Sequence, residues 1–245
     1  MKKILLSLLL AGTCSLQAQV ALTTEHVDIG LAEGPGLGIH WHDEDNNLEY
    51  EPDGAYAFID PVLALNTRPA ASQWNFLGGT VGGNIWILPQ TQNPNLLFLG
   101  VGAEEADAGT FDVWNPGDAR GANTSERWLE LSLVSVSGPG AFSVWQTNGF
   151  GAPIAYISTA ETLTGGNRLF VQEGGHSHYN WGFTSLGTYD VTFQVRGFIG
   201  GVEVTQQDIF TFSTSVIPEP STYALLGLGL AAIILLRRRN KNAST

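Results

Sequence analysis

Four of the five histidines stand in two His-x-His pairs, His40 with His42 and His176 with His178. Where such a pair lies in a β-strand, residues i and i+2 project from the same face, and both imidazoles can approach one ion. Zinc favours neutral imidazole nitrogens and completes a tetrahedron with a carboxylate or a water molecule. The two pairs therefore predict a zinc site. Its candidate ligands are His26, His42, His176, His178 and Asp43, with Asp28 or Asp43 as the partner that orients an imidazole.

The pair His176 and His178 also has a purely structural interpretation. The pair comes shortly before a strand with alternating apolar residues. In this interpretation its imidazoles cap the entrance of the strand and pack on the aromatic rings of Tyr179 and Trp181. The residues alone leave both the metal site and the packing role open.

A second candidate cation site is the acidic run at 43–47, which begins like a calcium-binding loop of the D-x-D-x-N type. The rest of the run departs from that pattern. Leu48 stands at the position of the turn glycine, and Gly54 stands at the position of the bidentate glutamate. The pattern therefore favours a solvated acidic loop over a calcium site.

The other chemistry-bearing residues favour binding over catalysis. The lone cysteine, Cys14, lies in an N-terminal apolar segment, so the exported chain would have no thiol for a disulfide, a thiolate site or a nucleophile. The sequence has no G-x-S-x-G, H-E-x-x-H, Walker or dinucleotide-binding pattern. Acidic pairs such as Glu104-Glu105 fit a solvated surface. We expect no enzymatic activity.

Seven tryptophans and a strong negative charge narrow the choice of ligand. Exposed tryptophans would stack on sugar rings, whereas buried ones would fill a core without disulfides, and we expect the second role.

The chain between the N-terminal apolar segment and the C-terminal apolar run is strongly acidic. It has five arginines, no lysine and 23 acidic residues, an excess of about 18 negative charges. This charge excludes nucleic acid, whose binding depends on basic residues, and attracts cations.

Both ends of the chain indicate export. Lys2 and Lys3 precede an apolar run, as in a secretory signal peptide. Near the other end Pro218-Glu219-Pro220 precedes an apolar run at 223–236 and then three arginines, which predicts a membrane helix with a cytoplasmic C-terminus. We divide the chain into a signal peptide (1–18), a β-domain (19–214), a linker with the Pro-Glu-Pro motif (215–220), a membrane-spanning sorting helix with its arginines (221–239) and a cytoplasmic tail (240–245).

This C-terminal arrangement resembles the PEP-CTERM sorting signal. The residues that carry the resemblance are Pro218, Glu219, Pro220, Arg237, Arg238 and Arg239. In that family an exosortase recognises and processes the tail. The resemblance implies a protein of the cell envelope, the cell surface or the extracellular matrix that is first anchored in the membrane.

The elements that must position the histidines are strands. Short alternating or β-branched runs are separated by Gly, Pro and Asn, and no helical period appears from 20 to 214. The pattern predicts an all-β domain, a β-sandwich with an immunoglobulin-like second half, and a final hairpin through Gly200-Gly201. We expect a loop at 66–79. The expected strands are 26–31, 38–42, 56–63, 84–88, 96–100, 110–114, 128–135, 141–147, 154–158, 168–171, 181–183, 188–198 and 202–214.

Several separated motifs between 22 and 214 also resemble the choice-of-anchor M domain. The matching runs include 25–30, 85–92, 138–142, 147–151 and 176–184. Relatives of that family occur on cell surfaces with metal-type ABC transporters, and one branch is associated with a zinc repressor. The resemblance implies a zinc-binding accessory in metal acquisition. It matches the histidines of the candidate set and Asp43, whereas His40 looks like a local addition.

Two functions follow as hypotheses. The first is an exported, membrane-anchored zinc-binding protein without enzymatic activity, with exosortase and a metal ABC transporter as partners. The alternative is a structural or adhesive matrix protein that binds exopolysaccharide or other surface proteins.

Overall fold

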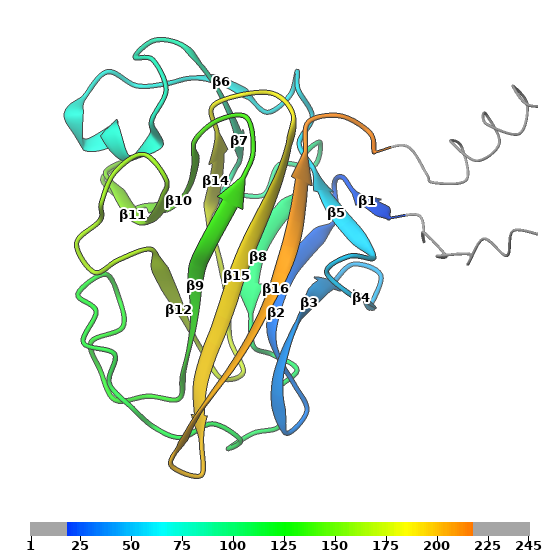
Figure 1. The fold of residues 1–245 in the computed structure, drawn as a ribbon, viewed down its shortest axis with the longest axis vertical. Helices are drawn as coiled ribbons and strands as arrows, with labels where there is room; N and C mark the ends of the chain where they lie inside the picture. Colours follow the sequence, from blue (N-terminus) through cyan, green and yellow to red (C-terminus); the bar gives the residue numbers. More distant parts are fainter. Residues whose placement is uncertain (1–18, 218–245) are drawn as a thin grey trace, which may run out of the picture. The chain divides into compact units, whose positions relative to one another are not determined.

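Strands make up most of the regular structure in residues 19–217, the part of the chain that the computed structural model describes (Figure 1). A single 3-10 helix accompanies them there. The elements are β1 (Val20–Leu22), β2 (His26–Glu33), β3 (Gly36–Asp43), β4 (Leu48–Tyr50), β5 (Ala55–Phe58), β6 (Leu65–Thr67), η1 (Ser72–Leu77), β7 (Asn84–Leu88), β8 (Phe98–Gly102), β9 (Trp128–Ser137), β10 (Phe142–Thr147), β11 (Pro153–Ser158), β12 (Arg168–Gln172), β13 (His176–His178), β14 (Asn180–Phe183), β15 (Thr188–Ile199) and β16 (Val202–Ser213).

The strands of these residues form three sheets in two layers. The six-stranded sheet has the order β1-β5-β16-β15-β9-β12 and lies in front in Figure 1. Behind it lie the β14 sheet, β11-β10-β14-β7-β6, and the β2 sheet, β13-β8-β2-β3-β4. The all-β class is confirmed, and the layers are consistent with a β-sandwich.

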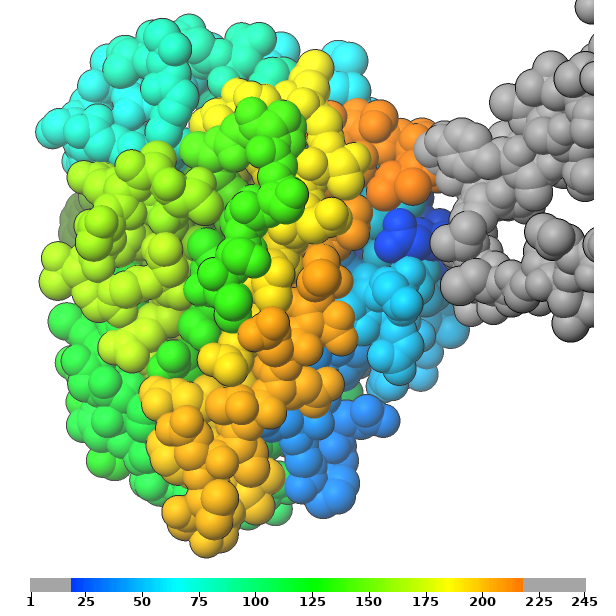
Figure 2. All heavy atoms as spheres, in the orientation of Figure 1, coloured from blue at the N-terminus to red at the C-terminus, as the bar shows by residue number. Residues whose placement is uncertain are grey.

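The β15–β16 hairpin is the longest pairing and shows why the six-stranded sheet forms. Its two strands pair in register from Thr188 with Ser213 to Ile199 with Val202. Alternate β15 residues, beginning with Tyr189, are buried, so one face packs inward. The turn residues Gly200 and Gly201 have φ values of 60° and 79°. A two-residue type I′ hairpin turn requires a positive φ at both of these positions. The predicted hairpin is confirmed, and Figure 2 shows its outer face beside β9.

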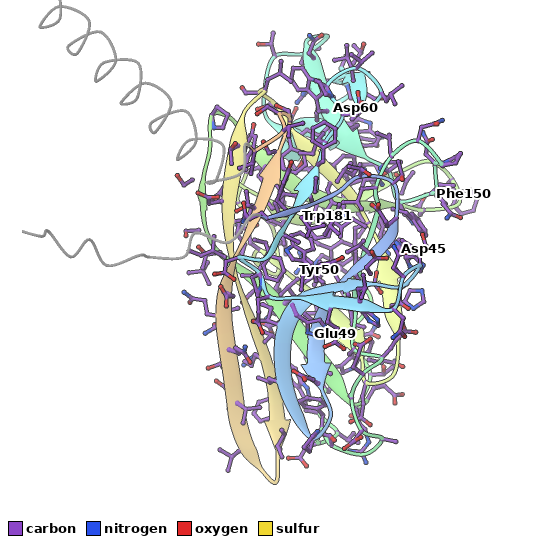
Figure 3. The ribbon with its side chains drawn as sticks, turned by 90° about the vertical axis from the view of Figure 1, so that its right-hand side faces the viewer. Asp45, Glu49, Tyr50, Asp60, Phe150 and Trp181 are labelled. Carbon is purple, nitrogen blue, oxygen red and sulfur yellow. The ribbon has the colours of Figure 1, made fainter. Side chains whose placement is uncertain are left out.

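Large aromatic side chains fill the space between the layers. Trp41, Trp181 and Phe212 are almost completely buried, and the ring of Phe212 lies 5.8 Å from each of the two tryptophans. Figure 3 places Trp181 in the middle of the molecule. Trp86, Trp128 and Trp145 are buried as well, and the other two tryptophans are half-buried. Five of the seven tryptophans therefore have the core role that the sequence predicted.

Three local expectations were wrong. No strand forms at 110–114: within the described chain this segment makes one isolated bridge, Trp114 with Glu126, and it is flanked by Gly109 and Gly117 with φ values of 87° and 66°. The expected loop at 66–79 contains part of β6 and all of η1, which buries Phe76 and Leu77. The second half of the domain differs from an immunoglobulin fold, where the second and third strands lie in different sheets, because β10 and β11 pair in one sheet.

Residues 19–217 contain no helix that is long and apolar enough to cross a membrane. The predicted signal peptide (1–18), the sorting motif at 218–220, the predicted membrane helix at 221–239 and the tail at 240–245 lie outside the described residues.

Candidate metal centre

All five histidines lie on the outer face of the β2 sheet. The inner face of β2 is apolar, since Val27, Ile29 and Leu31 are completely buried in the core. Side chains alternate along a strand, so His26 and Asp28, which alternate with these apolar residues, point to the opposite face. Strand alternation thus separates the core from a polar face within one strand.

The strand register extends this face across four strands. One row runs from His178 on β13 through Gly100 on β8 and Asp28 on β2 to His42 on β3. A second row, two residues along each strand, runs from His176 through Gly102 and Gly30 to His40. Residues that are paired across a sheet project from the same face. Histidines more than 130 positions apart in the chain therefore share one surface.

Glycines provide the space in which these polar side chains lie. A Cβ atom on Gly100 would stand 2.1 Å from Asp28 Oδ1 and 3.0 Å from the His178 ring. On Gly30 it would stand 2.4 Å from the His40 ring, and on Gly102 it would stand 2.8 Å from Asp28 Oδ2. Any other residue at these positions would displace a carboxylate or an imidazole, so the glycines form the floor of the polar cluster.

Three imidazoles converge at the β13 end of the face. The Nε2 atoms of His26 and His178 lie 3.1 Å apart, and the ring of His176 lies 5.7 and 5.4 Å from theirs. One ligand atom from each of the three lies within 4.8 Å of the others. Two nitrogens bound to a tetrahedral zinc ion at 2.0–2.1 Å lie about 3.3 Å apart. His26 and His178 have the spacing of two zinc ligands, and His176 offers a third nitrogen within 4.8 Å.

Neighbouring side chains hold these rings in place. The ring of Phe98 stacks on that of His178, with centroids 3.6 Å apart and planes inclined by 7°. Glu104 Oε1 lies 2.8 Å from His176 Nδ1. The structural interpretation of His176 and His178 predicted that they pack on Tyr179 and Trp181. Both of those rings are buried in the core, and His178 packs on Phe98 instead.

Asp28 is the carboxylate beside the three imidazoles. It is 1% exposed, its Oδ1 atom lies 4.0 Å from His26 Nε2, and it forms a possible ligand group with Glu104 and His176. Both of its oxygens lack a hydrogen-bond partner among residues 19–217. Burial raises the pKa of Asp28 to about 7, although the charge of His176 opposes the shift. A buried carboxylate without a partner is costly unless a cation compensates it, so this residue fits a metal ligand.

The protonation of His178 also fits a metal site. Burial, together with the charges of His26 and His176, lowers the pKa of His178 to about 4. His178 is therefore neutral at pH 7, which is the form that binds a metal. The hydrogen bond to Glu104 raises the pKa of His176.

A second donor group lies on β3 and the segment after β8. One ligand atom each from His40, His42 and Glu105 lies within 4.8 Å of the others. His42 Nδ1 contacts Glu105 Oε1 and lies 3.2 Å from Oε1 of Glu44. His40 is 7% exposed, and its Nε2 atom has no hydrogen-bond partner in the described part of the chain.

The predicted ligands thus fall into three places. His26, His176 and His178 come together, His42 lies in the neighbouring group, and Asp43 lies apart from both. The two carboxylate oxygens of Asp43 accept hydrogen bonds from the backbone and side chain of Asn46. Its Cα position pairs with Val27, whose side chain points into the core.

The acidic run at 43–47 is the turn between β3 and β4. Asn47 has a φ of 52°, and Asp43 closes the turn through Asn46. Asp45, at the margin of the molecule in Figure 3, accepts a hydrogen bond from the backbone of His26. Two of the carboxylates of this run thus stabilise the turn and attach it to β2.

Sequence reasoning missed four residues of the face as possible ligands. They are His40, Glu44, Glu104 and Glu105, and it treated Asp28 only as a supporting partner. The alternation in His26-x-Asp28 and His40-x-His42 was a usable signal for one strand face. The approach of Glu104 and Glu105 depends on the pairing of β8 with β2, for which the sequence offered no signal.

Comparison with known protein families matches one part of the chain, residues 216–239, to the PEP-CTERM protein-sorting motif. Comparisons with curated proteins and with solved structures found no match. The family comparison gives no support for the resemblance to the choice-of-anchor M domain. The matched motif points to an exported protein that an exosortase sorts to the cell surface.

Proposed function

We propose that this exported surface protein binds zinc through His26, His176, His178 and Asp28, as a non-enzymatic accessory in metal acquisition. The observation that supports the proposal most is the convergence of three imidazoles beside a buried carboxylate that lacks hydrogen-bond partners within residues 19–217. A divalent cation would compensate the carboxylate and would take up the unshared imidazole nitrogens.

The donor set favours zinc over calcium or magnesium. Those two ions prefer oxygen ligands, whereas three imidazoles with one carboxylate suit a tetrahedral transition metal. The excess of acidic residues over the whole domain raises the local concentration of any cation.

The number of donors favours binding rather than catalysis. Catalytic zinc sites have three protein ligands and keep the fourth position for water or substrate. Here Asp28 would occupy that fourth position, which leaves a closed site. A protein that holds zinc at the cell surface would supply it to an uptake system, and a metal ABC transporter is the partner that we propose.

The test is metal analysis of the exported protein, purified without a histidine tag. We expect zinc in the wild-type protein and one ion fewer per chain in the variant His176→Ala/His178→Ala. The matched control is Gln206→Ala/Gln207→Ala, which changes two exposed residues of β16 and should retain all of the zinc. Equal zinc content in the histidine variant and the wild type would reject the proposal.

The alternative, a matrix protein that binds exopolysaccharide, has less support from the described residues. Of the seven tryptophans, five are buried and two are half-buried, so none presents a fully exposed ring to a sugar. Retention of the protein on immobilised exopolysaccharide would favour this alternative.

A further inference from the structure

We infer that the same sheet face binds a second divalent transition-metal ion, through His40, His42, Glu44 and Glu105. This inference rests on the proposed function of metal binding and adds a second, separately removable ion. The four donors come from β3, from the turn after it and from the segment that follows β8.

His40 carries the first part of the argument. This imidazole is more than nine-tenths buried, and its Nε2 atom finds no hydrogen-bond partner in residues 19–217. It lies directly over Gly30, where even a methyl group would collide with the ring. A buried polar nitrogen without a partner is costly. His42 and Glu105 each offer a ligand atom within 4.8 Å of a ring nitrogen of His40. The nitrogen points to a ligand that binds at this position.

The two carboxylates around His42 carry the second part. Glu44 and Glu105 both approach the Nδ1 atom of His42. Two carboxylates that converge on one nitrogen repel each other, and a cation between them removes that repulsion. The Oε1 atom of Glu44 is buried and has no hydrogen-bond partner in the described chain, as expected for an oxygen that binds a metal.

The segment after β8 places one carboxylate at each of the two donor groups. The backbone of Glu105 accepts a hydrogen bond from Gly34, and Ala106 forms a bridge with Gly34, so this segment is fixed against the end of β2. Glu104 then contacts His176 in the first group, and Glu105 contacts His42 in the second. Glu104 and Glu105 lie in the turn that follows β8, and one segment thereby serves both groups.

Asp28 lies on the strand between the two groups. Its Cα position pairs with Gly100 on one side and with His42 on the other. The carboxyl group of Asp28 interacts electrostatically with Glu44 and Glu105 as well as with His176.

The second site, with two imidazoles and two carboxylates, suits zinc and also suits manganese or iron. The second site would therefore be less selective than the three-histidine site.

Titration of the chelator-stripped full chain with zinc, followed by native mass spectrometry, tests this inference. We expect two zinc ions per wild-type chain and one ion in each of the variants His40→Ala/His42→Ala and His176→Ala/His178→Ala. The fourfold variant should bind none, and Gln206→Ala/Gln207→Ala should bind two. Glu105→Gln, a milder change, should weaken only the second ion, by about 10–100-fold. Thermal unfolding of each metal-free variant shows that it is folded.

The outcomes separate the two sites. One ion in the wild type that only the His176 and His178 substitutions remove would overturn the second site and leave the proposed function intact. One ion that either pair of substitutions removes would indicate a single shared centre and would also overturn the inference. One ion that only the His40 and His42 substitutions remove would support the second site and reject the first. If the wild type and all variants bound no zinc, both sites would be rejected.

Discussion

Asp28 is the residue of the face whose environment is least compatible with a purely structural role. It occupies a position on β2 where an apolar residue would be tolerated, since the position is 1% exposed. Instead it places two oxygens, which have no hydrogen-bond partner among the described residues, beside His26 and His176. Natural proteins tolerate such a buried charge mainly where it serves binding, at a cost in stability. Stability and affinity should therefore respond to this residue in opposite directions.

Replacement of Asp28 by asparagine tests that relation. The amide has the same shape but no charge, and a buried neutral amide costs less than a buried carboxylate. We expect the metal-free variant to be more stable than the wild type at pH 8 by about 1–3 kcal/mol. We expect its zinc affinity to be about 10–100-fold weaker, measured by competition with a chromogenic chelator. Asp190→Asn, at an exposed position of β15, is the control and should change neither quantity. Unchanged zinc affinity in Asp28→Asn would contradict the role of this residue.

At the scale of elements, the ion pair of Arg120 with Asp118 anchors part of the long segment between β8 and β9. Arg120 donates three hydrogen bonds to Asp118, one from its backbone and two from its guanidinium group. The same guanidinium group donates to carbonyl groups of β11 and to those of Gly165 and Gly166. The pair thus connects three separate parts of the chain.

The stability supplied by this pair should depend on pH. The hydrogen bond from Arg120 holds the pKa of Asp118 below its ordinary value of 3.8. A lowered pKa in the folded state stabilises the fold above the unfolded pKa, and the contribution is lost as pH falls through the folded value. We expect the metal-free variant Asp118→Asn to be about 1–3 kcal/mol less stable than the wild type at pH 7, with a difference that shrinks below pH 3.8. Urea unfolding from pH 7 to pH 3 measures it, with exposed Asp53→Asn as the control. A difference that is constant with pH would refute this explanation.

Local patterns in the sequence predicted where the strands lie better than they predicted which strands pair with each other. Alternation along β15 and the Gly200-Gly201 turn depend on adjacent residues, and both predictions were confirmed. The pairing of β8 with β2 is parallel and joins segments about 70 positions apart, and β13 then pairs with β8. Such pairings depend on how whole sheets pack, which no short window of sequence records. The three-histidine group and the shared face of His40 and His42 could be anticipated, whereas the approach of Glu105 to His42 could not.

At the scale of the whole molecule, the domain and its sorting motif have different tasks. Residues 19–217 form a unit with its own core, and the matched motif occupies residues 216–239. The negative charge of the domain attracts cations from its surroundings. The sorting motif determines where those surroundings are, because it directs the chain to the cell surface. The proposed metal binding by the domain and the sorting that the motif implies should therefore be separable by substitution.

Replacement of Pro218, Glu219 and Pro220 by alanine tests that separation in cells. These residues begin the part of the chain that matches the PEP-CTERM motif, and exosortase processing is the step that the motif implies. We expect the triple variant to remain in the membrane fraction as a longer, unprocessed chain, whereas the wild type appears as a shorter form at the surface. Immunoblotting of cell fractions measures both size and location, and a strain without exosortase should reproduce the variant's behaviour.

The control Gln206→Ala/Gln207→Ala should be processed normally. The purified triple variant should bind as much zinc as the wild type, because its β2 sheet is unchanged; normal processing of the variant would show that these three residues do not direct sorting.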